Sequence, residues 1–416
     1  MGRDFPNRKM KFKKNIWYIS KYFMAPNEAY VGQRGHYLSK ELEKIGYKMT
    51  VINSNSFNKT KSIKLKNLYN FRNIDGVNYI TIKTKKYDNS YSINRLISWF
   101  DFEIKLCLLP LKEIYKPDIV IVSSLSLLTI INGIFFKLIF KSKLIFEIRD
   151  IWPLSLIEYK GYSRNNIFIL LLRFIEYIGY RFSDQIIGTM PLLSEHVNKI
   201  IGKNNKVRNI PNGFNIKMLE NNNISNKRIN NILNSDMKVI TYIGSIGISN
   251  NLDAFFKTIK NLSSNNELYF LVIGDGELKK KYKDKYGNLK NLFISDEVDN
   301  RFVNNILSRS SILYFSLSNN KIWDYGQSLN KIINYMLSGK PIIASYSGHR
   351  SMLNEANCGE FIEVDNFIEL EKAFIKYSKL SKKESSIIGM RGKNWLLRNR
   401  SYKKLALDYS MILEKL

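Results

Sequence analysis

Short apolar runs typical of buried strands alternate with amphipathic runs typical of helices along most of the chain. The first series begins with a strand over residues 15–20, a helix over 34–45 and a strand over 48–52. A second series starts with a strand over 238–242. Such alternation is typical of parallel sheets whose right-handed crossovers place helices on both faces. We therefore predict an α/β fold with two Rossmann-like, doubly wound domains that face a cleft.

A polar, asparagine-rich stretch separates the two series. Residues 215–235 show only weak periodicity and follow Pro-Asn-Gly at 211–213, which is a strong turn signal. We predict a first domain over residues 1–214, a linker over 215–236 and a second domain over 237–395. The 416 residues suffice for two domains of about 200 residues each.

The chain is strongly basic, with 65 lysine and arginine residues, 36 aspartate and glutamate residues, and a formal net charge of +29. This balance indicates an anionic partner: nucleic acid, anionic lipid or a phosphorylated substrate. Two cysteines, Cys107 and Cys358, exclude a disulfide framework and fit a reducing compartment. The most apolar window, 119–140, contains Asn132 and Lys137. We expect neither a membrane span nor a signal peptide, and a cytoplasmic location.

Two glycine-containing loops follow predicted strands and precede predicted helices. The first runs from Gly244 through Ser245 to Gly247, and the second from Gly274 to Gly276. Glycines let a backbone approach a phosphate, and a helix N-terminus attracts its charge. A plain tight turn between strand and helix explains either loop about as well.

The segment 325–344 is more specific. Ser328 is predicted to cap a helix over 329–337, which places Lys331 in its first turn. A lysine there opposes the helix dipole, and it is explained if it meets an anion. Asn334 lies three residues on and shares its face. The alternative is a solvated lysine.

This segment resembles the donor-binding signature of family 4 glycosyltransferases, especially the branch that makes bacterial O-antigen and capsule polysaccharides. The matching residues are Ser328, Lys331, Tyr335, Met336, Gly339, Lys340 and Pro341. Other matches, in family order, are Arg-Asp-Ile-Trp-Pro at 149–153, Ile-Pro-Asn-Gly at 210–213, the loops at 242–244 and 273–276, and Glu355–Gly359.

The resemblance implies the GT-B fold and a retaining sugar transfer from a nucleotide donor, without a metal or other cofactor. The implied donor is a UDP-N-acetylhexosamine or a deoxy derivative, and the implied acceptor is membrane-associated and polyprenyl-diphosphate-linked, in O-antigen or capsule biosynthesis. Lys331 is implied as a catalytic residue that stabilises the leaving diphosphate. The implied donor-binding residues are Gly244, Ser245, Gly247, Gly274, Gly276, Ser328, Lys331 and Asn334. A C-terminal helix over 396–416 is implied to return to the first domain.

Two departures from the family pattern affect the donor site. The family's paired glutamates fall at Gly326 and Asn334 in this chain. Asn334 can still hydrogen-bond a ribose hydroxyl, but it brings no charge. The basic residues that many relatives carry after the glycine loop are replaced by Ser245 and Asn250.

The first domain supplies the candidates for the acceptor side. Asp150 follows a predicted strand and is our second catalytic candidate, for orienting the acceptor hydroxyl or the transition-state charge; the alternative is a local cap paired with Arg149. Arg34 resembles the family's arginine in the loop and helix after the first strand. We assign Gly32, Arg34, His36 and Arg149 to acceptor binding, although a solvated helix arginine explains Arg34 almost as well.

Basic and aromatic residues of the first domain suit an anionic membrane surface. They comprise Ser90–Trp99, Lys83, Lys85, Lys86 and the cluster Lys9–Lys14. We expect a peripheral protein at the inner face of the plasma membrane, with an ordinary amphipathic core helix as the alternative reading of 90–99.

Three scattered histidines, two cysteines and the lack of an Asp-x-Asp pair predict no metal site. Two other functions stay open at this point. A sugar-nucleotide epimerase of the same fold would need several acids and a histidine in the cleft, and the chain is poor in them. A nucleic-acid-binding protein fits the charge, but the chain lacks zinc, helix-turn-helix and RNA-recognition signatures, so we expect no nucleic-acid partner.

Overall fold

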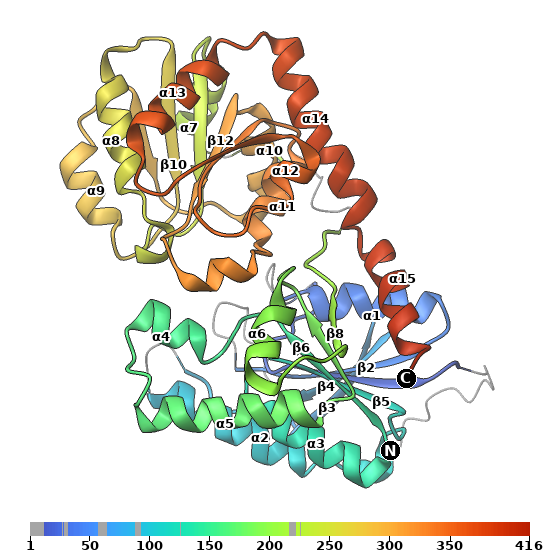
Figure 1. Ribbon diagram of the computed structural model, residues 1–416. Helices are drawn as coiled ribbons and strands as arrows, with labels where there is room; N and C mark the ends of the chain where they lie inside the picture. Colours follow the sequence, from blue (N-terminus) through green and yellow to red (C-terminus); the bar gives the residue numbers. More distant parts are fainter. Residues whose placement is uncertain are drawn as a thin grey trace.

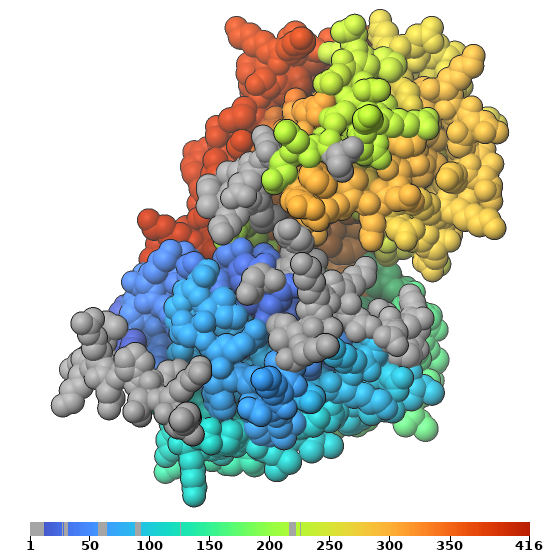
Figure 2. All heavy atoms as spheres, turned by 180° about the vertical axis from the view of Figure 1, so that it is seen from behind, coloured from blue at the N-terminus to red at the C-terminus, as the bar shows by residue number. Residues whose placement is uncertain are grey.

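The computed structural model describes residues 12–26, 28, 32–56, 65–87, 93–124, 126–215, 222–224 and 226–416. Two α/β domains lie one above the other, and the last helix of the chain lies against the N-terminal domain (Figure 1). From the opposite side, the domains are two masses that meet along part of their facing sides (Figure 2).

The N-terminal domain is built on an eight-stranded sheet in the order β3-β4-β2-β1-β5-β6-β7-β8. The side chains of β1, β2, β5 and β6 are almost all buried, as expected for parallel strands covered on both faces. The strands are β1 (Asn15–Ile19), β2 (Lys48–Ser54), β3 (Tyr69–Ile74), β4 (Val77–Ile82), β5 (Ile119–Ser123), β6 (Lys143–Ile148), β7 (Gln185–Gly188) and β8 (Val207–Asn209).

The edge strand β3 pairs antiparallel with β4 and was not predicted from the sequence. Its side chains are half-buried or exposed, so it lacks the apolar run that marks the central strands. The turn before β4 is formed by Asp75 and Gly76, both with positive φ. This Asp-Gly pair was the available signal for a hairpin.

Helices cover both faces of this sheet. On one face α1 packs with the C-terminal helix α15, and on the other lie α2, α3 and α5. The helices of the N-terminal domain are α1 (Arg34–Lys44), α2 (Ile93–Cys107), α3 (Thr129–Phe140), α4 (Leu154–Lys160), α5 (Ile167–Phe182) and α6 (Leu193–Ile201), with a 3-10 turn η1 (Leu111–Glu113).

The C-terminal domain has a six-stranded, fully parallel sheet in the order β11-β10-β9-β12-β13-β14. Its strands are β9 (Lys238–Ile243), β10 (Leu268–Ile273), β11 (Leu292–Ser295), β12 (Ile312–Ser316), β13 (Ile342–Ser345) and β14 (Gly359–Ile362). Its helices are α8 (Asp253–Asn261), α9 (Lys279–Tyr286), α10 (Asn300–Arg309), α11 (Asn330–Leu337), α12 (Leu353–Ala356), α13 (Phe367–Ser378) and α14 (Lys382–Asn399), with 3-10 turns η3 (Ile248–Asn250), η4 (Leu262–Ser264) and η5 (Lys321–Tyr325). The two sheets, parallel except for the edge strand β3, confirm the predicted α/β fold class.

Part of the stretch predicted as a linker is helical. Helix α7 (Lys227–Leu233) buries Ile229, Ile232 and Leu233 against the second sheet. Because these apolar side chains recur at helical spacing, α7 packs as an element of the C-terminal domain. The division of the chain at residues 214 and 237 itself stays a prediction.

The chain crosses between the domains twice, and the two crossings lie side by side. The amide of Phe214 donates to the carbonyl of Arg400 over 3.1 Å, and Phe214 bridges to Ser401. A Cβ on Gly213 would lie 2.8 Å from that carbonyl, so a side chain there would push the crossings apart. Helix α14 ends at this point, and α15 (Tyr402–Leu413) continues onto the N-terminal domain, where it packs on α1.

Candidate active site

The second sheet reverses its strand order between β9 and β12, and the glycine loops after β9 and β10 lie near this point. The loops pack directly on each other: the amide of Gly244 donates to Ile273 and that of Ile246 to Asp275. A Cβ on Gly274 would lie 1.9 Å from the carbonyl oxygen of Gly244. A Cβ on Gly276 would likewise lie 2.5 Å from the carbonyl oxygen of Ile246. Loop packing alone therefore requires glycine at positions 274 and 276. The same packing holds the loop that carries Gly244 in place.

Lys331 lies in the first turn of α11, beside that loop. Its Nζ donates to Asn250 Oδ1 over 2.6 Å and lies 4.9 Å from the ring centroid of Tyr242. A Cβ on Gly244 would lie 3.0 Å from its Cε. Within the described residues it has no carboxylate partner. Burial without a counter-charge lowers its pKa to about 7.

Ser328 does not cap α11, contrary to the prediction. The cap position is Leu329, without a side-chain hydrogen bond. Ser328 instead accepts a hydrogen bond from the amide of Asn212 through Oγ (3.0 Å) and from Asn212 Nδ2 through its carbonyl (2.6 Å). This serine therefore joins the two domains three residues before Lys331. Asn334, one turn further along α11, is half-buried.

The residues before Ser328 also contact the first domain. The amide of Leu192 donates to Tyr325, and the rings of Tyr159 and Trp323 meet edge to face. Trp323 Nε1 and Gln327 Nε2 are buried donors without a partner in the described part of the chain. Buried donors are normally paired, so these two N–H groups are exceptions to the usual pattern.

In the first domain, the carboxylate of Glu147 on β6 is fully buried at the centre of a hydrogen-bond network. It accepts from Tyr18 on β1 (2.8 Å), from Ser123 on β5 (2.9 Å) and from Arg34 on α1 (2.9 Å). The remaining Arg34 donors reach the carbonyls of residues 210 and 211. The arginine holds the pKa of Glu147 below its ordinary value against the effect of burial.

Within this network Arg34 is buried and bonded internally through its Nε and both terminal nitrogens, so it is not the solvated helix arginine of the alternative reading. His36 is also buried: its Nδ1 lies 2.9 Å from the Tyr79 hydroxyl, and burial lowers its pKa. Gly32 has φ of +75°, and a Cβ there would lie 2.6 Å from the carbonyl of Tyr22. Packing accounts for the position of all three, and their assignment to acceptor binding stays a prediction.

Arg149 is the acceptor-side candidate that keeps free donors. Its Nε and Nη1 are buried and have no partner among the described residues. Burial lowers its pKa, while the nearby Glu147 carboxylate opposes that effect. Because Arg34 already neutralises Glu147, one positive charge remains at this strand end.

Asp150 follows Arg149 but does not pair with it. Its oxygens accept hydrogen bonds from Trp152 Nε1 (2.9 Å) and from the Ser155 hydroxyl, and burial raises its pKa. These contacts fix the start of α4. Each carboxylate oxygen can accept a further hydrogen bond.

Glu147 was not singled out from the sequence, and Asn250 was noted only as a departure from the family pattern after the glycine loop. Glu147 had a signal, because it is an acid inside an otherwise apolar strand and must find a buried partner. The contact of Asn250 with Lys331 was not predicted, since it spans 81 positions of sequence.

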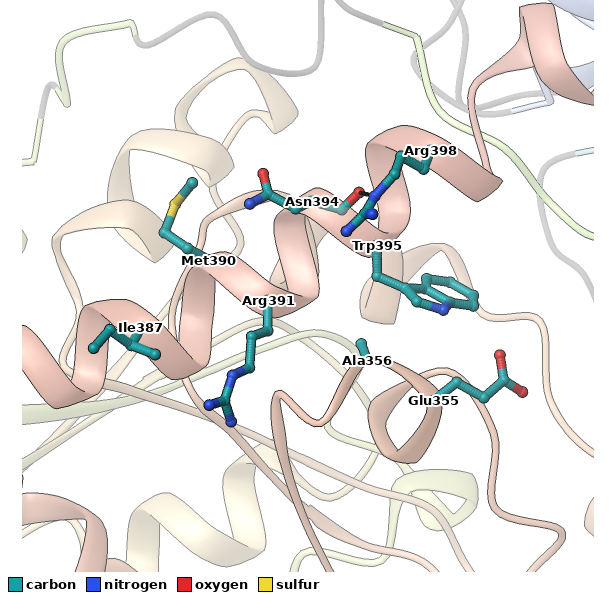
Figure 3. Close-up of a pocket in the computed structure, with 8 residues that line it drawn as sticks. All are labelled: Glu355, Ala356, Ile387, Met390, Arg391, Asn394, Trp395 and Arg398. Carbon is teal, nitrogen blue, oxygen red and sulfur yellow. Dashed lines mark hydrogen bonds between the residues drawn. The ribbon is translucent and has the colours of Figure 1, made fainter.

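Two cavities lie away from these residues. One, of about 410 Å³, is lined by α14 and the neighbouring Glu355 and Ala356, with Trp395 and Arg391 among its walls (Figure 3). The other, of about 390 Å³, lies in the first domain beside α2. No cluster of possible metal ligands occurs among the described residues. Within the same residues, no helix is long and apolar enough to cross a bilayer.

Comparison with known families matches residues 237–379 to the family "Glycosyl transferases group 1". This match identifies the second half of the chain as a glycosyltransferase domain. The matched residues contain the glycine loops, Lys331 and Asn334. No curated protein matches this glycosyltransferase in sequence.

Solved structures share its fold along almost the whole chain. Sucrose-phosphate synthase from Thermosynechococcus elongatus is similar with a TM-score of 0.71 and 14% identity, covering 97% of this chain and 99% of that one. Anabaena HepE in complex with UDP and glucose gives 0.65 and 11%, covering 97% and 100%. WaaG, a glycosyltransferase involved in lipopolysaccharide biosynthesis, gives 0.63 and 11%, covering 95% and 99%.

The Arg34 network yields a stability prediction. Arg34→Met leaves the buried Glu147 carboxylate without its cation, so the free energy of unfolding should fall by about 3–5 kcal/mol. Urea unfolding followed by circular dichroism measures this change. Adding Glu147→Gln should restore part of the loss, because the uncompensated charge is removed. Unchanged stability of Arg34→Met would contradict the internal role.

Proposed function

We propose that this glycosyltransferase moves a sugar from a UDP-linked donor, with retention of configuration and without a metal, onto a lipid-linked acceptor. The observation that carries the proposal is Lys331: a lysine at a helix N-terminus, beside a glycine loop, with no described counter-charge. A diphosphate at this position would supply the missing negative charge. HepE, a protein of the same fold, has been solved with UDP and glucose.

The donor site would lie where the second sheet reverses its strand order, as ligands do in open α/β sheets. Lys331 and the N-terminus of α11 would stabilise the charge that grows on the leaving UDP. The backbone of Gly244, Ser245 and Gly247 would approach the diphosphate, held by Gly274 and Gly276. Asn334 would bond a ribose hydroxyl in place of the family's glutamate. Ser328 would place this segment against the acceptor domain.

On the acceptor side, Arg149 offers two free donors and an uncompensated charge, which suits an acceptor diphosphate. We keep Asp150 as the catalytic candidate that orients the acceptor hydroxyl, since its oxygens are fixed by Trp152 and Ser155. A UDP-N-acetylhexosamine or a deoxy derivative as donor, a polyprenyl-diphosphate-linked acceptor and a place in O-antigen or capsule synthesis at the inner face of the plasma membrane complete the proposal. WaaG, with the same fold, is involved in lipopolysaccharide biosynthesis.

The direct test is incubation with UDP-sugars and polyprenyl-diphosphate-linked acceptors in EDTA, with mass detection of the product. We expect transfer to proceed at the rate seen without chelator, because protein cations stabilise the leaving group. Loss of turnover in EDTA that Mg²⁺ restores would exclude the metal-independent mechanism.

Removing the Lys331 ammonium tests the donor site. Lys331→Ala should weaken UDP binding by about ten- to a hundredfold, because a charge-assisted contact contributes about 1.5–3 kcal/mol. Calorimetric titration with UDP measures this loss, and turnover should fall at least as much. Lys382→Ala, at an exposed position of α14, is the matched control. Asn334→Glu should hold or raise UDP affinity. Parental UDP affinity in Lys331→Ala would place the donor elsewhere.

The lowered pKa of Lys331 predicts a pH dependence. The diphosphate binds the charged ammonium, and the free protein loses this charge as pH rises through about 7. UDP is fully ionised above that pH, because the second phosphate pKa is about 6. UDP affinity should therefore fall by up to about tenfold per pH unit above pH 7, with proton uptake on binding. Titrations in buffers of different ionisation enthalpy measure the uptake, which Lys331→Ala should abolish.

A further inference from the structure

The outward side of α2, α3 and α5 carries large apolar side chains. We call this side the apolar face and define it by Ile93, Phe100, Ile104, Leu138, Ile167 and Phe174. The exposed fraction reaches 76% for Ile93, 72% for Leu138 and 84% for Ile167. The three helices are in contact, α2 with α3 and α3 with α5, so the face is continuous. It lies on the side of the N-terminal domain away from the C-terminal domain (Figure 1).

These helices already bury a separate apolar side against the sheet. Phe102 and Leu106 of α2, Phe136 of α3 and Leu172 of α5 belong to the core. The sheet therefore does not explain the outward set. Contiguous exposed apolar patches on this scale mark an interaction surface.

In the described residues of these three helices, the exposed charges that lack an opposite partner are positive. The acids of these helices are engaged within the domain: Glu103 accepts from Thr129 and Asn132, Glu176 lies 2.7 Å from His196, and Asp101 pairs with Lys105. Arg173 and Arg181 of α5, by contrast, are exposed. A partner that fits this face therefore combines an apolar surface with negative charge.

A basic cavity borders the apolar face along α2. This cavity of about 390 Å³ is lined by Lys83, Lys85, Lys105 and Ile97, together with Leu68, Thr84 and Asp101. Ile97, Asp101 and Lys105 recur at four-residue spacing and so line one side of α2. Glu103, on the other side, reaches α3. Lys83 and Lys85 are exposed and form no ion pair with a described residue.

We infer that the apolar face docks into an anionic lipid bilayer, and that Lys83 and Lys85, at the rim of the cavity, receive a lipid headgroup phosphate. A bilayer offers apolar chains beneath a negative surface, which is the combination that this side of the domain matches. A second copy of the chain would bring the same basic rim to the same place, at a net charge of +29 for each copy. The inference rests on the proposed function for its membrane partner alone. It assigns that contact to α2, α3 and α5. Residues 90–92 of the segment expected from the sequence, and residues 9–11 of the expected basic cluster, lie outside the described residues.

Vesicle sedimentation without donor or acceptor tests the inference. One set of vesicles is phosphatidylcholine alone, and the other has equal parts of phosphatidylcholine and phosphatidylglycerol. The full chain should bind the anionic set more tightly. Lys83→Ala with Lys85→Ala should weaken this binding roughly 30-fold, since each surface lysine contributes about a factor of five. Lys382→Ala with Lys383→Ala, on α14, is the charge-matched control and should change it little.

Substitutions in the apolar face test its own contribution to vesicle binding. Phe100→Ser with Ile104→Ser should lower binding to both vesicle types by at least about tenfold, whereas Ile368→Ser, at an exposed position of α13, should not. Equal binding of the parent to both vesicle sets, or equal losses in controls and face variants, would overturn the inference. So would face variants that split a dimer in solution yet bind vesicles as the parent does. UDP titration of every variant separates the two proposals: the face variants should keep parental affinity, and a parent that binds anionic vesicles but not UDP would refute the donor site alone.

Discussion

The N-terminal domain depends on one buried ion pair, between Arg34 and Glu147. A carboxylate in the interior is tolerated only when its lone pairs are satisfied. Glu147 meets this requirement with hydroxyls from two neighbouring strands and the guanidinium from α1. Through Arg34 the same network holds the carbonyls of residues 210 and 211, just before the chain leaves the domain. The ion pair thus sets where α1 begins and where the first crossing starts. Helix α15 closes over this region, with Tyr402 stacked on Tyr37.

The two domains treat buried cations in opposite ways. Arg34 is neutralised inside the protein by Glu147, and its charge contributes to the fold. Among the described residues, the half-buried Lys331 has only neutral partners, the side-chain amide of Asn250 and the hydroxyl and ring of Tyr242. Arg149 is intermediate, since the carboxylate nearest to it is already shared with Arg34. A buried charge that the protein does not balance is costly unless a ligand balances it. This cost is the physical basis for placing donor and acceptor phosphates at these two residues.

Local patterns were sufficient to predict the two parallel sheets and the glycine loops, because strand and helix periodicity and turn residues act over a few positions. They were not sufficient for Arg34, whose contact with Glu147 spans 113 positions, or for Ser328, whose partner Asn212 is 116 positions away. In the sequence, both look like surface residues that could bind a ligand. Only tertiary packing shows that they connect elements of the fold. The same applies to α7, where three buried apolar residues lie within an otherwise polar stretch.

The paired crossings at Phe214 and Arg400 define how the domains can move. Two adjacent chain segments joined by a hydrogen bond act as a strap: they let one domain rotate about their common line and resist separation or sliding. Rotation about that line would strain the contact between Asn212 and Ser328. Asn212 lies two residues before Phe214 in the strap, and Ser328 lies three residues before Lys331. Any force that shifts the start of α11 is therefore transmitted to the angle between the domains. The segment that carries Lys331 is thus connected, through one pair of hydrogen bonds, to the place where the chain passes between the domains.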